Sequence, residues 1–183
     1  KPYLFQAVKK DEDKLTALHA ALWNGGAFVY VPKNVDVEIP LQAILYNDKA
    51  EATFAPHILI VAESNSRVTY VDSVVTDKAT VGAPFVHPSI VEVFVKPGAL
   101  VRFGSIHSMG PTGVDMSVRR AVVENDGRIE WVIGDLNDGN TVSDTKSVLQ
   151  GQGATSDAKV ISVGQGQQDL SLTTQAVHYG KNS

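Results

Sequence analysis

The chain has 183 residues, of which 43% are hydrophobic and 20% charged, proportions that are typical of one globular domain with a real core. Sixteen basic residues against twenty acidic ones give a formal charge of −4, which argues against nucleic acid or an anionic membrane as a partner. The absence of cysteine excludes disulfides, thiolate chemistry and cysteine-ligated zinc within these residues, and it favours a cytoplasmic location.

Charge and hydropathy runs add two further expectations. The basic pairs at 9–10 and 119–120 are isolated from other basic residues, so they are predicted to lie on solvated faces. No apolar run approaches the roughly 20 residues that a membrane-spanning helix needs. The sequence therefore predicts neither a nucleic-acid footprint nor a membrane span.

Residues 11–23 are predicted to form the one convincing helix of the chain. Asp11 is placed to cap it, leucines at every third or fourth position share one face, and Gly25 and Gly26 follow its end. His19 lies one position off the apolar face and is expected at a helix boundary. Because the terminal coil of a repeat protein needs a cover, we expect this helix to cap the open first coil.

From residue 27 onward the chain consists of short strands and tight corners. Residues 91–106, VEVFVKPGALVRFGSI, alternate with a period of two on both sides of Lys96-Pro97-Gly98-Ala99. Pro97 fixes φ and Gly98 can adopt a positive φ, so this tetrapeptide predicts a tight turn.

The same unit recurs along the chain. The last apolar residue before each corner is Val31, Val61, Val95, Val123, Leu149 and Val177. Successive corners are between 26 residues (123 to 149) and 34 residues (61 to 95) apart. A near-constant period without intervening helices predicts an all-β fold, a parallel β-helix or β-solenoid with one N-terminal capping α-helix. The predicted domains are an N-terminal segment at 1–26 and a β-helix core at 27–183 that is truncated at its C-terminal end.

The sequence contains no strong catalytic or cofactor motif. There is no phosphate-binding loop and no nucleophile elbow, so no catalytic and no cofactor-binding residue is assigned. His57, His87, His107 and His178 are weak candidates for metal ligands, but counted from the corners they occupy different phases, so no metal site is assigned. Asp135 and Asp138 are expected in a solvated turn.

Three segments carry a resemblance to a known family: WNGGAFVYVPKNVDVEIPLQ at 23–42, HILIVAESNSRVTYVDS at 57–73 and VEVFVKPGALVRFGSIHS at 91–108. They resemble the core of the SufB/SufD family of the iron–sulfur cluster assembly (SUF) machinery, and more closely its SufD branch. The resemblance implies a right-handed β-helix in a non-enzymatic scaffold subunit.

The same resemblance implies partners. These are a SufB-like scaffold chain and a SufC-like ABC ATPase, the latter bound through a C-terminal region outside this chain, and a homodimer is also possible. An iron–sulfur cluster forms at the interface of the full complex in the family, but no residue here matches the family's cluster histidine.

Two other functions stay open at this stage. Many parallel β-helices are polysaccharide lyases or hydrolases, which would require a carboxylate-lined groove along the stack. A β-sandwich sugar-binding module would also give short strands with frequent turns, and it would require antiparallel pairing.

Overall fold

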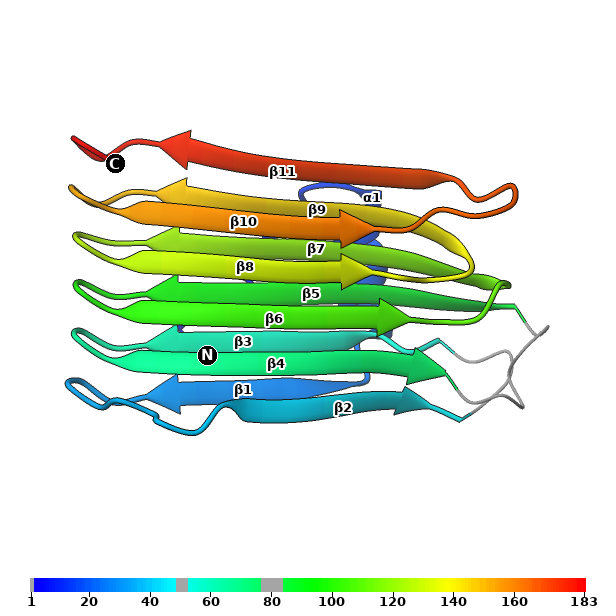
Figure 1. Ribbon diagram of the computed structural model, residues 1–183, viewed down its shortest axis with the longest axis horizontal. Helices are drawn as coiled ribbons and strands as arrows, with labels where there is room; N and C mark the ends of the chain where they lie inside the picture. The colour runs from blue at the N-terminus through cyan, green and yellow to red at the C-terminus, as the bar shows by residue number, and fades with distance from the viewer. Residues whose placement is uncertain (1, 49–52, 77–83) are drawn as a thin grey trace.

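The chain folds into two parallel sheets that face each other and climb together as a right-handed coil (Figure 1). The computed structural model describes residues 2–48, 53–76 and 84–183. One sheet has six strands in the order β1-β3-β5-β7-β9-β11, and the other has five in the order β10-β8-β6-β4-β2. Each pairing between these strands is parallel, for example β5 with β7. This confirms the predicted β-helix, and it is incompatible with the antiparallel β-sandwich.

The elements alternate regularly between the two sheets. In chain order they are α1 Lys14–Leu22, β1 Gly25–Val31, β2 Leu41–Asn47, β3 Pro56–Ala62, β4 Arg67–Thr76, β5 Phe85–Val95, β6 Leu100–Ser108, β7 Gly113–Val123, β8 Arg128–Asp135, β9 Asn140–Leu149, β10 Thr155–Ser162 and β11 Leu170–His178.

The corners at one end of the coil stack on one another because each holds a residue in the left-handed conformation. The positions are Asn34, Asn65, Gly98, Asp126 and Gly153, with φ between 52° and 68°. Asparagine, aspartate and glycine are the residues that adopt this conformation most readily. Their amides bond to the next corner; the N–H of residue 65, for example, donates to Pro97 O at 3.0 Å. The repeated corner thus makes each coil a template for the next.

The apolar interior runs beside these corners. Val31, Ala62, Val95, Val123 and Leu149 are paired in register and buried. Two of the predicted corner positions are therefore shifted by one residue, since Ala62 and His178, rather than Val61 and Val177, continue this row. On the facing sheet, Tyr70, Phe103 and Trp131 form an aromatic row with ring centroids 5.6 and 5.3 Å apart.

The helix begins and packs differently from the prediction. Asp13, not Asp11, is the N-cap, and it forms a capping box with Thr16. The buried residues of α1 are Thr16 and His19, whereas Leu18 and Leu22 are 36% and 38% exposed. His19 is thus part of the packed face rather than a boundary residue.

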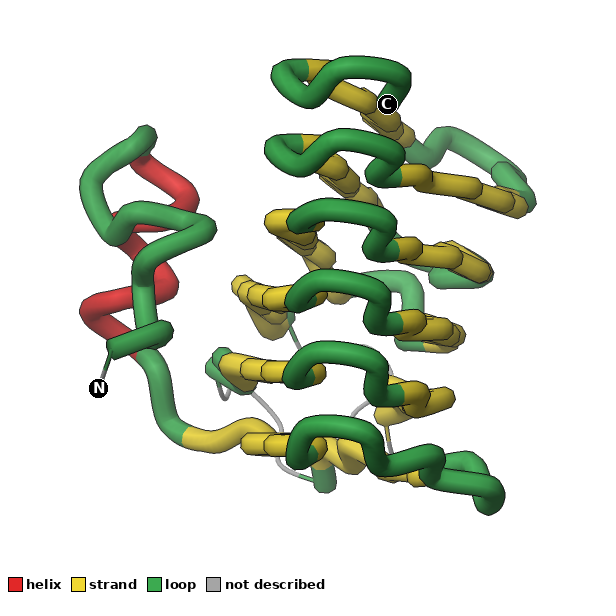
Figure 2. The backbone as a smooth tube through the Cα atoms, turned by 90° about the vertical axis from the view of Figure 1, so that its left-hand side faces the viewer, coloured by secondary structure: helices red, strands yellow, loops and turns green. Residues whose placement is uncertain are grey.

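The position of the helix is also different. Figure 2 shows α1 rising alongside the six-stranded sheet, and it packs mainly on β5, so it covers an outer face and not the open end of the first coil. The N-terminal segment joins it there: Tyr3, Leu4 and Ala7 pack on Val61 and Phe94. This cover explains why β3 is buried along its whole length. With nine residues in α1, nowhere in the described chain does a helix reach the length and apolarity needed to cross a bilayer.

Candidate functional site

Away from the corners, the interior of the β-helix becomes polar and charged. His87 on β5 and Asp115 on β7 are register partners in the six-stranded sheet, and His107 on β6 belongs to the facing sheet. The three residues are 0%, 1% and 3% exposed. The two imidazole rings lie edge to face with centroids 5.5 Å apart. The fold thus brings together two of the four candidate histidines.

Asp115 is held by hydrogen bonds from three side chains. Its Oδ2 lies 2.6 Å from His107 Nδ1 and accepts from Asn137 Nδ2 at 3.0 Å, while its Oδ1 accepts from Ser117 Oγ at 2.7 Å. Burial by itself would raise the pKa of Asp115. The opposing effects of His107, His87 and Arg119 together hold the pKa well below its ordinary value, so the carboxylate is ionised.

Arg119 supplies the positive charge of this centre, although it was predicted on a solvated face. It is 1% exposed, donates to Ser143 Oγ at 2.8 Å and lies 3.7 Å from Asp135 Oδ1. Asp135 is also buried, at 2% exposure, which corrects its expected place in a solvated turn; Asp138 is exposed as expected. A buried arginine needs such a partner, because an unpaired charge in the interior is strongly destabilising.

His87 stands out because neither of its ring nitrogens makes a hydrogen bond of normal geometry, although the Phe54 backbone lies close enough to influence its pKa. Burial lowers the pKa of His87 to about 4, so the ring is neutral at pH 7. Together with His107, Asp72 and Ser105 it lines a small cavity of about 10 Å³. Burial also raises the pKa of Asp72, against the opposing effect of its hydrogen bond from Ser105.

A second buried cluster lies outside the coil, beneath the helix. His19 Nδ1 bonds to Pro88 O at 2.9 Å, His19 Nε2 lies 3.1 Å from His57 Nδ1, and His57 Nε2 lies 2.9 Å from Glu92 Oε2. Burial lowers the pKa of His19, so its ring is neutral at pH 7, and since a carbonyl only accepts, Nδ1 is the donor and Nε2 the acceptor. His57 therefore donates from Nδ1 to His19, and its other nitrogen faces the buried carboxylate of Glu92.

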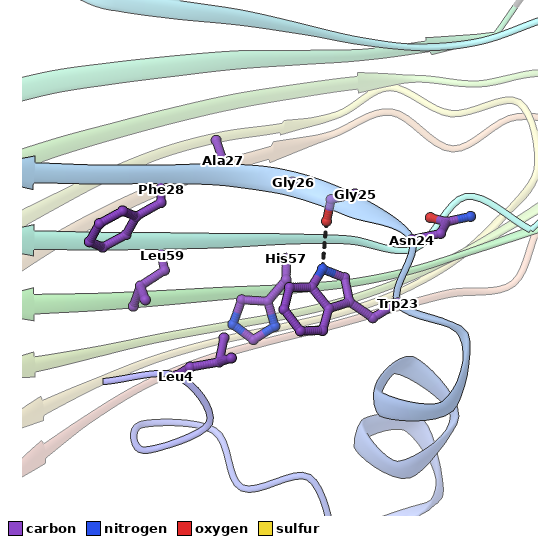
Figure 3. A pocket seen from close by; sticks show the side chains of 9 residues that line it. All are labelled: Leu4, Trp23, Asn24, Gly25, Gly26, Ala27, Phe28, His57 and Leu59. Carbon is purple, nitrogen blue, oxygen red and sulfur yellow. Dashed lines mark hydrogen bonds between the residues drawn. The ribbon is translucent and has the colours of Figure 1, made fainter. Parts of the chain in front are cut away.

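Glu92 also fastens the N-terminal segment to the sheet. Its carboxylate accepts from the backbone N–H groups of Phe5, Ala7 and Val8 at 2.6, 2.7 and 3.0 Å. Beside it, Figure 3 shows Trp23 next to His57, with the indole N–H donating to Gly25 O at 2.6 Å. The groove beside Trp23 and His57 has a volume of about 640 Å³, and none of the residues that line it is acidic.

The remaining candidate histidine is unconnected to either cluster. His178 is exposed near the end of the chain, 3.2 Å from Ser183 Oγ. The residues that sequence reasoning missed, Asp115 and Arg119, did leave a signal. They share the odd-numbered positions of β7 with Ala121 and Val123, and an apolar residue at such positions marks the inward face.

Fold and site together define a stacked β-helix protein whose buried interior, rather than an open cleft, holds its clustered polar side chains. Residues 44–183 match the profile of the SufBD core domain of the SUF system for FeS cluster assembly, and residues 1–43 match the SufBD protein N-terminal region. The chain belongs to this SufBD family.

Curated relatives agree with this assignment. The chain is 43% identical, over its whole length, to the iron–sulfur cluster assembly protein SufD of Bacillus subtilis (strain 168), of which it covers 42%. It is 32% identical, over 84% of its length, to SufBD family iron–sulfur cluster assembly proteins of Staphylococcus haemolyticus and Staphylococcus aureus, of which it covers 33%. The chain therefore spans less than half the length of these relatives.

Proposed function

We propose that the protein is a non-enzymatic scaffold subunit of the SUF machinery, which pairs with a SufB-like chain and serves a SufC-type ATPase in the cytosol. The observation that carries this proposal is the SufBD family membership of a chain that is 43% identical to a SufD protein. In this proposal the iron–sulfur cluster is cargo, assembled at the interface of the full complex, and the ATPase binds a C-terminal region outside this chain. A homodimer is the alternative pairing.

The architecture is suited to a scaffold. Two parallel sheets, locked together by stacked corners, form a stiff body that can present a few ligands at a fixed position on a partner. β11 ends the six-stranded sheet and pairs with β9 alone among the described strands, so its other edge can pair with a further strand. Most side chains of β11 are exposed.

A polysaccharide lyase or hydrolase is less well supported. The acidic side chains Asp72, Asp115 and Asp135 are buried inside the coil, out of reach of a polymer. A charged groove does exist at the surface, where Asp36 and Glu38 line it, but Asp36 is already paired with Arg67 at 3.3 Å. No specific observation therefore favours glycan chemistry over the scaffold.

The test is co-purification of the full-length protein, tagged, with its co-expressed SufB-type and SufC-type chains. We expect both chains to be retained in stoichiometric amounts, and the purified complex to assemble a cluster that is visible by its absorbance when iron and sulfide are supplied. A β-helix protein of unrelated family with the same tag serves as the control. Retention of neither chain would contradict the proposal, and release of unsaturated sugars from an acidic glycan would favour the lyase.

A further inference from the structure

We propose that His87, His107 and Asp115 form a binding site for one divalent transition-metal ion inside the β-helix. One nitrogen of each histidine and one carboxylate oxygen all lie within 4.8 Å of one another, and the described residues contain no second group of three such side chains. The ligands come from three strands of two stacked sheets, so their positions are set by the register of the coil. The site requires only these residues and does not depend on the scaffold role.

His87 supplies the first reason for the proposal. A fully buried imidazole without a normal hydrogen bond leaves a polar group unsatisfied, which is destabilising and is rare in native interiors. Metal coordination gives a ring nitrogen of His87 the partner that no hydrogen bond of normal geometry supplies. His87 is therefore better explained as a ligand than as a packing residue.

The charge balance of the centre supplies the second reason. Arg119 can only donate, so in its contact with His107 Nε2 at 3.4 Å that nitrogen is the acceptor, and the ring proton lies on Nδ1, facing Asp115. Asp72, Asp115 and Asp135 are all buried around this centre, and Arg119 is the basic side chain that faces Asp135. Neither oxygen of Asp135 has a hydrogen-bond partner, and a bound cation supplies positive charge to a centre in which buried acidic side chains outnumber the buried arginine.

The ligand set selects the class of metal. Two imidazoles and one carboxylate suit Zn²⁺, Fe²⁺, Co²⁺ or Ni²⁺, whereas Mg²⁺ and Ca²⁺ prefer all-oxygen sites. Metal–ligand bonds of about 2.1 Å in a tetrahedral site place the ligand atoms roughly 3.4 Å apart. The ligand atoms of the three side chains lie within 4.8 Å of one another, so small side-chain movements bring them to this geometry. The cavity of about 10 Å³ has room for one water molecule as a fourth ligand.

The surrounding hydrogen bonds fit this role. Ser117 and Asn137 orient the carboxylate of Asp115, as partners of metal ligands usually do. When the ion takes the place of the His107–Asp115 hydrogen bond, the ring proton moves from Nδ1 to Nε2. Arg119 then turns from His107 to Asp135, which already lies 3.7 Å away.

The experiment is a titration of tag-free, metal-free full-length protein with Co²⁺, followed by visible absorption and by competition with a chelator. The site variants are His87→Gln and Asp115→Asn, and the matched control is His178→Gln, which removes an exposed histidine. We expect the wild type and the control to bind one more equivalent of Co²⁺ than either site variant, or to bind it at least about 100-fold more tightly. Equal stoichiometry and affinity in all four proteins would overturn the proposal.

Two further measurements keep the test decisive if a site variant fails to fold. Ser117→Ala retains all three ligands and should weaken Co²⁺ binding by about 10- to 100-fold, because it releases one oxygen of Asp115. Crystals of the wild type soaked in Co²⁺ should give an anomalous peak between the three side chains. Binding unaffected by Ser117→Ala, or an anomalous map with its peaks elsewhere, would refute the site.

Discussion

Glu92→Gln tests whether one buried carboxylate fastens the N-terminal segment to the six-stranded sheet. The substitution preserves size but replaces one acceptor oxygen with an NH₂ group. In the wild type, Glu92 accepts a hydrogen bond from the N–H of Phe5 at 2.6 Å. In the variant the amide oxygen faces Ala7 and Val8, so the NH₂ group faces the N–H of Phe5 and cannot accept from it. Phe5 N–H is then left without a partner, which destabilises the attachment by about 1–3 kcal/mol.

The other bonds weaken as well. Hydrogen bonds to a carboxylate contribute roughly twice as much as bonds to a neutral amide, so the bonds to Ala7 and Val8 and the contact with His57 weaken too. The sum is a loss of about 3 kcal/mol in the free energy that holds the segment down. Since each 1.4 kcal/mol is a factor of ten in an equilibrium constant, the open form of the segment becomes about 100-fold more populated.

Native-state hydrogen exchange of the amides of Phe5, Ala7 and Val8 measures this opening directly. Glu130→Gln is the matched control, because Glu130 makes its bonds to Arg102 and Arg128 at the surface, where ion pairs contribute about 0–1 kcal/mol. The control should leave exchange of the three amides unchanged. If Glu92→Gln also left exchange within about threefold of wild type, the carboxylate would not be the anchor.

Two further predictions concern the corner and the helix. Gly98→Ala should lower the free energy of unfolding by about 1–2 kcal/mol, because φ is 68° at this position. The control Gly134→Ala should change the free energy of unfolding by less than about 0.5 kcal/mol, because its new methyl group meets its nearest neighbour at an ordinary 3.7 Å. Equal effects of the two substitutions in chemical denaturation would contradict the role of the left-handed corner. Burial lowers the pKa of His19, so below pH 6.5 the unfolded chain binds this proton more readily than the folded chain, and stability falls with falling pH by at most about 1.4 kcal/mol per pH unit from this group. His19→Gln should therefore flatten the stability profile between pH 6.5 and 5 relative to the exposed-site control His178→Gln, and an unchanged slope would exclude His19 as a source of it.

The repeat could be predicted from the chain, but the register could not. Val61 and Ala62 are both apolar and both buried, because the N-terminal segment covers the outer face of β3, so the pattern alone does not say which of them faces inward. A shift of one residue exchanges the two faces of a strand. Val177 was misplaced for a different reason: the row continues at His178, a polar residue, so the last apolar residue of the strand is not the one that faces inward.

Counting residues from the corners predicted that the two histidines of the candidate site lie apart, whereas the stacking of the coil brings them together. His87 precedes its corner and His107 follows it, on opposite sheets, so their distances from the corner differ while their heights in the coil agree. Similarly, the pair at 119–120 was predicted to be solvated because it is isolated from other basic residues. Arg119 faces inward to Asp135, and Arg120 faces outward to Glu12 at 2.6 Å.

By itself the sequence determined the alternation of strands and the residues able to turn the corners, because both depend on local geometry: a period of two, and the small set of side chains that adopt a positive φ. Only the tertiary structure decided which face of each strand is buried, where α1 lies, and that His87, His107 and Asp115 meet. These features depend on contacts between residues distant in the chain, whose alignment is set by the whole stack of coils and the segment that covers it.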